Sequence, residues 1–368
     1  MRILIVSAKI PHRDFNSNDS LIQAFKDLGH EVITCGPIIG NTEEPIVSPR
    51  DIKVIDKSIH PEYYTYKEIL DKCDKTPDFI LQVDPHFYLS GDKPKDIKSG
   101  YYIVDVHRGA DIFRRMSIEG KFDYIFIAQK FFIPIFTHIG LNCFWIPRAH
   151  DDTFIKEQNI NTECDLVFCG ETGISDTLNI FNKLDFDINL RYHDGYYPDV
   201  SFQNRYRSWS NMSLEYIERA EILIRLSKDY NLRIYDKTYG ENYAKAISRG
   251  KILVNHSLWK DSALRNFEVL ACNRFLIADN IPFQEELLED KKHYAAYNQY
   301  FSPLVDNFKL EYEEIRSLVD YYLSHDLERK RITNIGKEYV RKWHTFKNRA
   351  KTIVDIVEGK SNGYVRPY

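Results

Sequence analysis

Short apolar runs and amphipathic segments alternate along most of the chain. Near the start, the apolar run Arg2–Val6 predicts a buried strand, and Glu31–Cys35 predicts a second one. Between them, Ser20–Leu28 carries apolar residues at helical spacing, and Gly29 is typical of the end of a helix. This alternation of strand and helix is typical of α/β domains with parallel sheets.

The same pattern continues through both halves of the chain. In the first half we expect a helix over Tyr66–Cys73 and strands over Phe79–Val83, Tyr101–Val106, Tyr124–Ala128 and Phe144–Ile146. In the second half we expect strands over Asp165–Gly170, Ile188–Tyr192, Leu232–Tyr235, Ile252–Asn255 and Phe275–Ala278. Helices are expected over Leu214–Ser227, Tyr312–Leu323, Leu327–Trp343 and Arg349–Val357.

Length and composition fit two domains. The chain has 368 residues, 43% of them hydrophobic, which is enough for two full cores. A polar, turn-rich stretch from Pro147 to about Cys164 predicts a linker, so we place an N-terminal domain at residues 1–150 and a C-terminal domain at 151–340. A net charge of −4 gives no reason to expect a nucleic-acid partner.

The apolar runs and the cysteines indicate a cytoplasmic protein. The first strand is too short for a signal peptide, and no later run approaches the length of a membrane span. Peripheral membrane contact is left open, because amphipathic segments are common in this chain. The six cysteines contain no C-x-x-C pair and are interpreted as reduced structural thiols.

The segment Lys251–Asp279 carries the clearest chemistry. It predicts a short strand, a polar turn, a short helix and a second strand that ends in an acid. Ligands bind beyond the carboxyl ends of such parallel strands. We expect Asp261 or Ser262 to cap the helix, whose first-turn amides then form an anion site. Arg265 and Glu268 are three residues apart and share one helical face, suited to a phosphate and to ribose hydroxyls.

Three segments together resemble one family. The sequence RNFEVLACNRFLIADN, from Arg265 onward, resembles the R-x-F-E-x-x-A-C-G-x-F-L-x-x-D segment of the CgeB-like (spore-maturation) glycosyltransferases. Tyr243–Asn255 is similar to the entry into a strand in that family, and His344–Arg349 resembles its HTY-x-x-R helix. The likeness extends from about Asp165 to Val357. It implies the GT-B fold, in which two Rossmann-like, doubly wound α/β domains face a cleft. It also implies that a C-terminal helix, here residues 341–368, crosses back to the N-terminal domain.

The resemblance also implies a function. A glycosyltransferase of this type takes a nucleoside-diphosphate sugar in its C-terminal domain and passes the sugar to a hydroxyl acceptor (a glycan, a protein or a lipid-linked sugar) bound mainly by the N-terminal domain. No metal and no other cofactor are expected. From the resemblance and from their places after the strands together, the donor-binding candidates are Gly170, Glu171, Thr172, Lys237, Asn255, His256, Arg265 and Glu268. On spacing alone, the loop after Gly170 is equally well a simple βα turn, and Asn255 a buried residue that caps the next turn.

The chain departs from the related retaining enzymes at two points. No R-x(4–5)-K-G follows Gly170, so the cation for the donor phosphates must come from Arg265 or, as second choice, from Lys237. The Glu-x7-Glu pair keeps only its second acid, Glu268, because Lys260 stands in place of the first. The contact to the transferred sugar is therefore unassigned.

In the N-terminal domain, polar residues follow the strand that ends near Val106. His107 resembles the histidine that related enzymes place against the donor sugar, although a histidine bonded within a turn is the general alternative. An inverting enzyme would need a base, and the candidates are Asp84, Asp105 and Asp111. A retaining enzyme needs stabilisation of the departing diphosphate instead, for which Arg265 is the candidate. We favour retention and take His107, Asp105 and Arg265 as the catalytic candidates.

Two other interpretations stay open. An epimerase that acts on nucleotide sugars has the same architecture, and a non-catalytic nucleotide-sugar-binding scaffold is suggested by the missing first acid. The triplet Asp185-Phe-Asp187 matches the D-x-D that binds a metal in the other glycosyltransferase fold, but its flanking order does not fit. We expect a surface turn there and no metal.

Overall fold

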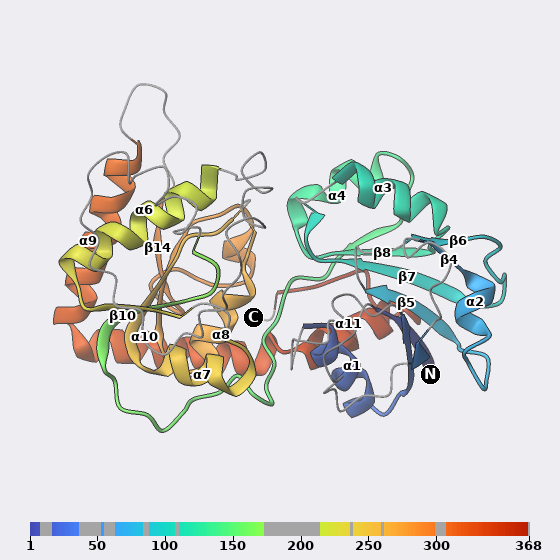
Figure 1. Cartoon of the computed structure of the whole chain (residues 1–368), viewed down its shortest axis with the longest axis horizontal. Coiled ribbons are helices and arrows are strands. Elements are labelled where there is room, and N and C mark those ends of the chain that lie inside the picture. Colours follow the sequence, from blue (N-terminus) through green and yellow to red (C-terminus); the bar gives the residue numbers. More distant parts are fainter. Residues whose placement is uncertain are drawn as a thin grey trace, which may run out of the picture. The chain divides into compact units, whose positions relative to one another are not determined.

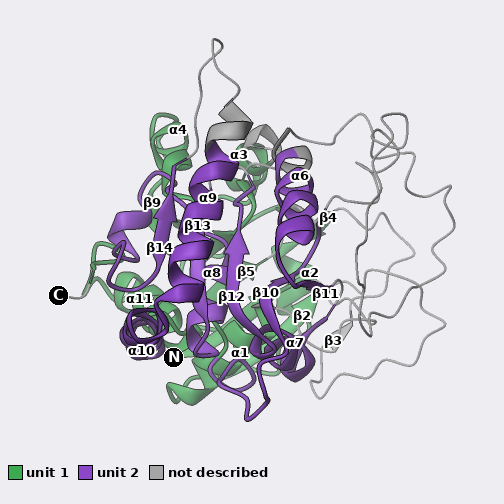
Figure 2. Ribbon diagram, turned by 90° about the vertical axis from the view of Figure 1, so that its left-hand side faces the viewer, with its two compact units in different colours: residues 1–151, 344–368 green, residues 152–343 purple. Residues whose placement is uncertain are grey.

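A computed structural model describes residues 1–7, 17–36, 53–54, 63–83, 88–106, 110–172, 214–235, 238–258, 261–298 and 307–366. The chain divides into two compact units (Figure 2). The first unit contains Met1–Asp151 and His344–Tyr368, and the second contains Asp152–Trp343. Each unit has its own parallel sheet and its own buried core, as the predicted α/β fold requires.

Seven parallel strands form the main sheet in the described part of the first unit. Their spatial order is β3 (Lys53–Val54), β2 (Glu31–Gly36), β1 (Arg2–Val6), β5 (Phe79–Val83), β7 (Lys98–Ile103), β8 (Tyr124–Ile127) and β9 (Cys143–Trp145). A separate two-stranded sheet pairs β4 (Tyr63–Thr65) with β6 (Tyr88–Ser90). The chain order reverses between β1 and β5, which is the arrangement of a doubly wound fold.

Helices cover both faces of this sheet. They are α1 (Ser17–Asp27), α2 (Tyr66–Leu70), α3 (Ala110–Glu119), the 3₁₀ turn η2 (Lys130–Phe132), α4 (Ile133–Thr137) and α11 (Phe346–Val357). Figure 1 shows α1 and α11 on one side and α3 and α4 on the other. Side chains of successive strand residues point to opposite faces of the sheet. A continuous apolar run such as that of β1 therefore contributes buried side chains to both faces of this sheet.

The last helix of the chain belongs to the first unit. The amide of His150 donates to the His344 carbonyl at 3.0 Å, and the Phe346 amide donates to the His150 carbonyl at 3.2 Å. Arg349 of α11 is fully buried, and its Nε donates to the Pro147 carbonyl at 2.7 Å. These bonds tie α11 to the segment that follows β9. The predicted return of the C-terminal helix to the N-terminal fold is therefore confirmed.

Five parallel strands form the sheet of the second unit, among its described residues. Their spatial order is β11 (Leu232–Tyr235), β10 (Cys164–Cys169), β12 (Gly250–Asn255), β13 (Phe275–Asp279) and β14 (Ala295–Tyr297). The chain starts at β10, passes to β11 on one side, and then continues with β12 on the other side. The order of the strands thus reverses between β10 and β12.

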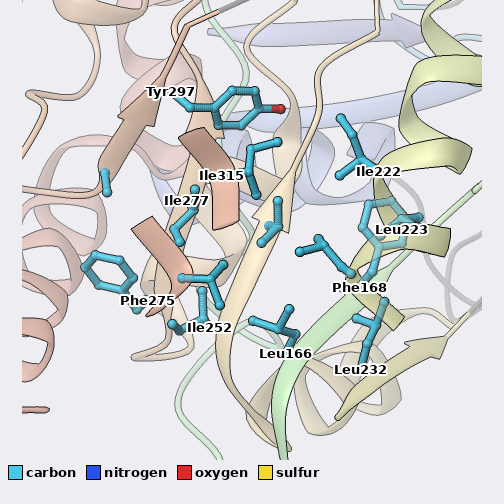
Figure 3. Packing of buried hydrophobic residues seen from close by; sticks show 14 of the residues in the cluster. Leu166, Phe168, Ile222, Leu223, Leu232, Ile252, Phe275, Ile277, Tyr297 and Ile315 are labelled. Atoms are coloured by element: carbon cyan, nitrogen blue, oxygen red, sulfur yellow. The ribbon is translucent and has the colours of Figure 1, made fainter. Parts of the chain in front are cut away.

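Two layers of helices enclose the second sheet. Figure 1 shows α6 (Leu214–Asp229) and α9 (Asn307–Ser324) on one side of it, and α7 (Gly240–Ser248), α8 (Leu264–Ala271) and α10 (Asp326–Trp343) on the other. A 3₁₀ turn, η5 (Gln284–Glu286), follows β13. In Figure 3, Phe168 and Ile252 of the sheet pack with Leu223 of α6 and Ile315 of α9. Burial of each such side chain stabilises the fold by about 1.5–3 kcal/mol.

Most predicted elements are present, and the differences have local causes. The strand predicted at Tyr101–Val106 is β7, which both starts and ends three residues earlier, at Lys98 and Ile103. Its first three residues, Lys98 to Gly100, give no apolar signal in the sequence. Glycine is needed at position 100, because an added Cβ would lie 2.7 Å from the Phe126 ring and 2.9 Å from the Phe79 ring. The predicted strand Ile188–Tyr192 lies outside the described residues.

Candidate functional site

The point at which the strand order reverses in the second unit is a natural place for a ligand. Doubly wound sheets bind ligands in the crevice beyond the carboxyl ends of the two strands that flank this point. Here these strands are β10 and β12. Gly170, Glu171 and Thr172 follow β10, and His256 and Ser257 follow β12. The structure thus brings two of the segments predicted from the sequence to one edge of the sheet.

Arg265, in the first turn of α8, reaches this edge. Its Nη1 donates to Oδ1 of Asn255 at 2.6 Å, and its guanidinium carbon lies 4.4 Å from the centre of the Phe168 ring. Among the described residues, no ion pair includes Arg265, and its Nε has no hydrogen-bond acceptor. A half-buried guanidinium without a carboxylate partner favours the binding of an anion.

Gly170 allows the guanidinium to lie against the loop after β10. Its φ of +126° is in the region that favours glycine. A Cβ at this position would lie under 3.0 Å from Nη2 of Arg265, which is closer than real Cβ atoms approach. The guanidinium of Arg265 therefore packs directly against the backbone of Gly170, in the space that a side chain at position 170 would occupy.

Asn255 fixes the position of Arg265 without cancelling its charge. The side chain is fully buried, and its Nδ2 donates to Oδ1 of Asn266 at 2.8 Å. This bond orients the amide so that Oδ1 faces Arg265. A neutral amide thus occupies the place at which a carboxylate would neutralise the guanidinium. Asn255 accordingly holds Arg265 and has no surface of its own to offer a ligand.

Glu268, one turn after Arg265, is 8% exposed and lies against Tyr243 of α7. Burial raises the pKa of the Tyr243 hydroxyl, and the negative charge of Glu268 and a hydrogen bond between the two side chains raise it further. Both Glu268 and Arg265 act electrostatically on this hydroxyl. Arg265 and Glu268 therefore lie on the same face of α8, as predicted, and both lie near Tyr243.

His256 is a buried histidine, 2% exposed, at the end of β12. The Tyr297 hydroxyl donates to the Asn255 carbonyl at 3.0 Å, so its oxygen accepts from Nδ1 of His256, also at 3.0 Å. The other ring nitrogen, Nε2, lies 3.4 Å from the carboxylate of Glu218. His256 therefore links β12 to β14 and α6.

Asp279 ends β13 behind this group. It is fully buried, and its Oδ1 accepts from the amide of Ser257 at 2.9 Å. Burial raises the pKa of the Asp279 carboxyl above its usual value, although the nearby His256 and the hydrogen bonds from Ser257 oppose the rise. The segment after β12 is thus held from both sides, by Tyr297 and by Asp279.

The predicted cap of α8 is wrong. The helix starts at Leu264 with Ala263 as its N-cap, and no side chain caps it. Asp261 and Ser262 lie one or two residues too early, because the Asp261 amide closes a turn onto the Leu258 carbonyl at 3.2 Å. No side-chain oxygen of the cap residue therefore competes for the amides of the first turn of α8.

In the first unit, one of the catalytic candidates is engaged in an ion pair. Nη2 of Arg148 donates to the Asp105 carboxylate and also to the Val104 carbonyl, the latter at 3.0 Å. Three other predicted site residues, Asp84, His107 and Lys237, lie outside the described residues.

Arg219 is a site residue that was not predicted from the sequence. This residue of α6 is 4% exposed, and it donates to the His256 carbonyl through Nε at 2.9 Å and to the Glu171 carbonyl through Nη1 at 3.0 Å. No motif marks it in the sequence. The available signal is a charged residue beside Ala220, on the otherwise apolar face of a predicted helix.

The whole chain is similar in fold to solved glycosyltransferase structures. Sucrose-phosphate synthase from Thermosynechococcus elongatus has a TM-score of 0.59 at 12% identity, over 97% of this chain and 98% of that one. A glycosyltransferase from Rickettsia africae has a TM-score of 0.56 at 13% identity, over 98% of both chains. HepE from Anabaena, in complex with UDP and glucose, has a TM-score of 0.54 at 10% identity, over 96% of this chain and 99% of that one. The fold is GT-B.

The sequence comparison supports the same fold. The model of a family described as glycosyl transferase-like matches residues 203–355, a range that includes Arg219, Asn255, Arg265 and Glu268. No curated protein matches this chain. In the described part of the GT-B chain, no helix combines the length and the apolar character needed to span a membrane.

Proposed function

We propose that this GT-B protein is a glycosyltransferase that moves a sugar from a nucleoside-diphosphate sugar to a hydroxyl acceptor. The observation that carries the proposal is the guanidinium of Arg265. It lies at the strand ends of the second unit, against Gly170, with a neutral amide as its hydrogen-bond partner. Such a group is suited to the diphosphate of a donor.

The chemistry of transfer explains why this cation matters. When the bond between the sugar and the diphosphate breaks, negative charge develops on the departing phosphate oxygens. A positively charged group held in advance near these oxygens lowers the barrier, because it has no need to reorganise during the reaction. Arg265 takes this role in our proposal, with Glu268 on the ribose hydroxyls of the donor.

The identity of the nucleotide is proposed by analogy. HepE has been solved with UDP and with UDP-glucose. We take uridine as the first base to test, with glycans, proteins and lipid-linked sugars as acceptor classes. We further propose a CgeB-like enzyme that transfers with retention of configuration and without a metal. Asp105, one of the three candidate bases of an inverting reaction, is engaged in an ion pair with Arg148.

A thermal-shift panel tests the proposal. UDP, GDP, ADP and the corresponding nucleotide sugars are added separately to the wild-type protein and to Arg265→Gln. Lys245→Gln, which removes a surface charge in the same unit, serves as the control. At a hundredfold excess over its Kd, a ligand stabilises the protein by about 2.7 kcal/mol. We expect one nucleotide class to stabilise the wild type and Lys245→Gln but not Arg265→Gln.

Turnover then separates the alternatives. Release of nucleoside diphosphate from the sugar nucleotide supports a transferase, whereas conversion to an isomeric sugar nucleotide identifies an epimerase. Binding without any turnover identifies a scaffold. A wild-type protein that binds none of the nucleotides would refute the donor site itself.

A further inference from the structure

Arg219 joins the two strand ends that flank the reversal of strand order in the second unit. Its Nε and Nη2 both donate to the carbonyl of His256, after β12, at 2.9 and 2.5 Å. Its Nη1 donates to the carbonyl of Glu171, after β10, at 3.0 Å. One buried guanidinium from α6 thus holds two backbone segments that are far apart in the sequence.

These bonds set the orientation of two peptide planes. In a trans peptide, the carbonyl and the following N–H point in opposite directions. Because the His256 carbonyl faces Arg219, the Ser257 amide points away from it and meets Asp279 at 2.9 Å. By the same argument, the amide of Thr172 points away from Arg219.

The loop that Arg219 holds is also the loop that touches Arg265. Gly170 lies against the guanidinium of Arg265, and the next residue, Glu171, is bonded to Arg219. Both guanidinium groups also lie near the ring of Phe168, Arg219 at 5.7 Å and Arg265 at 4.4 Å from its centre. A shift of this loop would therefore change the surroundings of Arg265 directly.

Helix α6 makes a second contact at the same place. Glu218, the residue before Arg219, lies 3.4 Å from Nε2 of His256. Two consecutive side chains of α6 thus contact His256 at the end of β12. Glu218 lies against the imidazole ring of His256, and Arg219 donates to its backbone carbonyl. These two contacts fix the position of α6 relative to the end of β12.

We propose that Arg219 is a positioning residue for the donor phosphates. It orients the backbone that follows β10 so that Gly170 stays against the guanidinium of Arg265. This inference rests on the proposed function, because it assigns Arg219 to the same donor site. Arginine is required, because its planar fork reaches two carbonyls at once, whereas the ammonium of lysine is a single point charge.

The test compares Arg219→Lys with Arg225→Lys. Both variants keep the charge, and both lie on α6, but Arg225 is half-buried and is paired with Glu221 four residues earlier. Isothermal calorimetry measures the Kd of UDP, or of GDP or ADP if the wild type binds one of these instead. Hydrogen exchange measures the protection of the amides of residues 170–172 without any nucleotide.

We expect Arg219→Lys to raise the Kd roughly tenfold through the loss of hydrogen bonds. We also expect faster exchange at residues 170–172, while Arg225→Lys matches the wild type in both measurements. Unchanged exchange, or faster exchange with an unchanged Kd, would overturn the positioning role. Arg219→Gln serves as a second variant, and if neither Arg219 variant folds, the residue is structural and the proposal is wrong.

The two proposals fail in different ways. If the wild type binds no nucleotide, the donor site is wrong, and a role of Arg219 in donor binding falls with it. If the wild type binds a nucleotide and Arg219→Lys binds it equally well, only the role of Arg219 is refuted.

Discussion

Nη1 of Arg265 donates to Oδ1 of Asn255 at 2.6 Å, so the cation at the edge of the sheet is held by a neutral amide. The amide is itself fixed by Asn266, which accepts from the other end of the same side chain. This arrangement keeps the position and the charge of the guanidinium together. The role of this charge can therefore be tested by a substitution at Asn255.

Asn255→Asp should weaken nucleotide binding strongly. The substitution keeps the size of the side chain but places a carboxylate against Arg265, which then forms an ion pair in place of binding phosphate. We expect the Kd of the bound nucleotide to rise at least roughly tenfold, as measured by calorimetry.

A double-mutant cycle provides the control for this substitution. In an Arg265→Gln background, Asn255→Asp should have little further effect on the Kd, because the guanidinium is already gone. Equal effects of Asn255→Asp in both backgrounds would contradict the proposed pairing.

Gly170→Ala should reduce both stability and nucleotide affinity. The added methyl group meets Arg265, and the φ of +126° disfavours any side chain, at a cost of roughly 1–3 kcal/mol for the backbone alone. Gly240→Ala is a matched control, because Gly240 has a φ of +56° and no atom within 4 Å of an added Cβ. Thermal unfolding and calorimetry should show a loss of stability for both variants, but a loss of affinity for Gly170→Ala alone. A loss of affinity in Gly240→Ala would argue against a specific role for Gly170.

Glu268→Gln should reduce discrimination between ribose and deoxyribose. If the Glu268 carboxylate accepts from the ribose hydroxyls, the wild type should bind UDP roughly tenfold more tightly than its 2′-deoxy analogue. The ratio of the two Kd values should fall toward one in Glu268→Gln and stay unchanged in Glu241→Gln, a surface substitution on α7. A wild-type protein that binds both nucleotides equally well would remove Glu268 from the ribose site.

Asp279 should make the stability of the second unit depend on pH. Burial raises the pKa of its carboxyl in the folded protein, so the folded state holds this proton at pH values where the unfolded chain has released it. The contribution of Asp279 is therefore fully present below the unfolded pKa of about 3.9. It is lost as the pH rises through the higher pKa of the folded state.

The measurement for Asp279 is urea unfolding of the wild type and of Asp279→Asn across this range of pH. The free energy of unfolding of the wild type should fall relative to that of the variant as the pH rises. A constant difference between the two proteins would show that the pKa of Asp279 is not raised.

Local patterns in the sequence were sufficient for most of the secondary structure. The strands Arg2–Val6, Phe79–Val83 and Leu232–Tyr235 have the bounds that were predicted, because a short apolar run between polar segments has few alternatives to a buried strand. The resemblance of a few segments was also sufficient to predict the GT-B fold. The cap of α8 was predicted wrongly, because the side chain that would serve as a cap depends on the turn before the helix, and periodicity does not report that turn.

Within the site, sequence spacing determined only which residues share an element. Arg265 and Glu268 lie three apart on α8, so their common face followed from helical geometry. The tertiary structure alone decided that Arg219 meets Glu171 and His256, which are 48 and 37 residues away. These contacts depend on the order in which β10 and β12 enter the sheet, and on α6 packing over their ends. Spacing along a chain specifies neighbours within one helix or strand, whereas contacts between elements exist only after the hydrophobic core has brought those elements together.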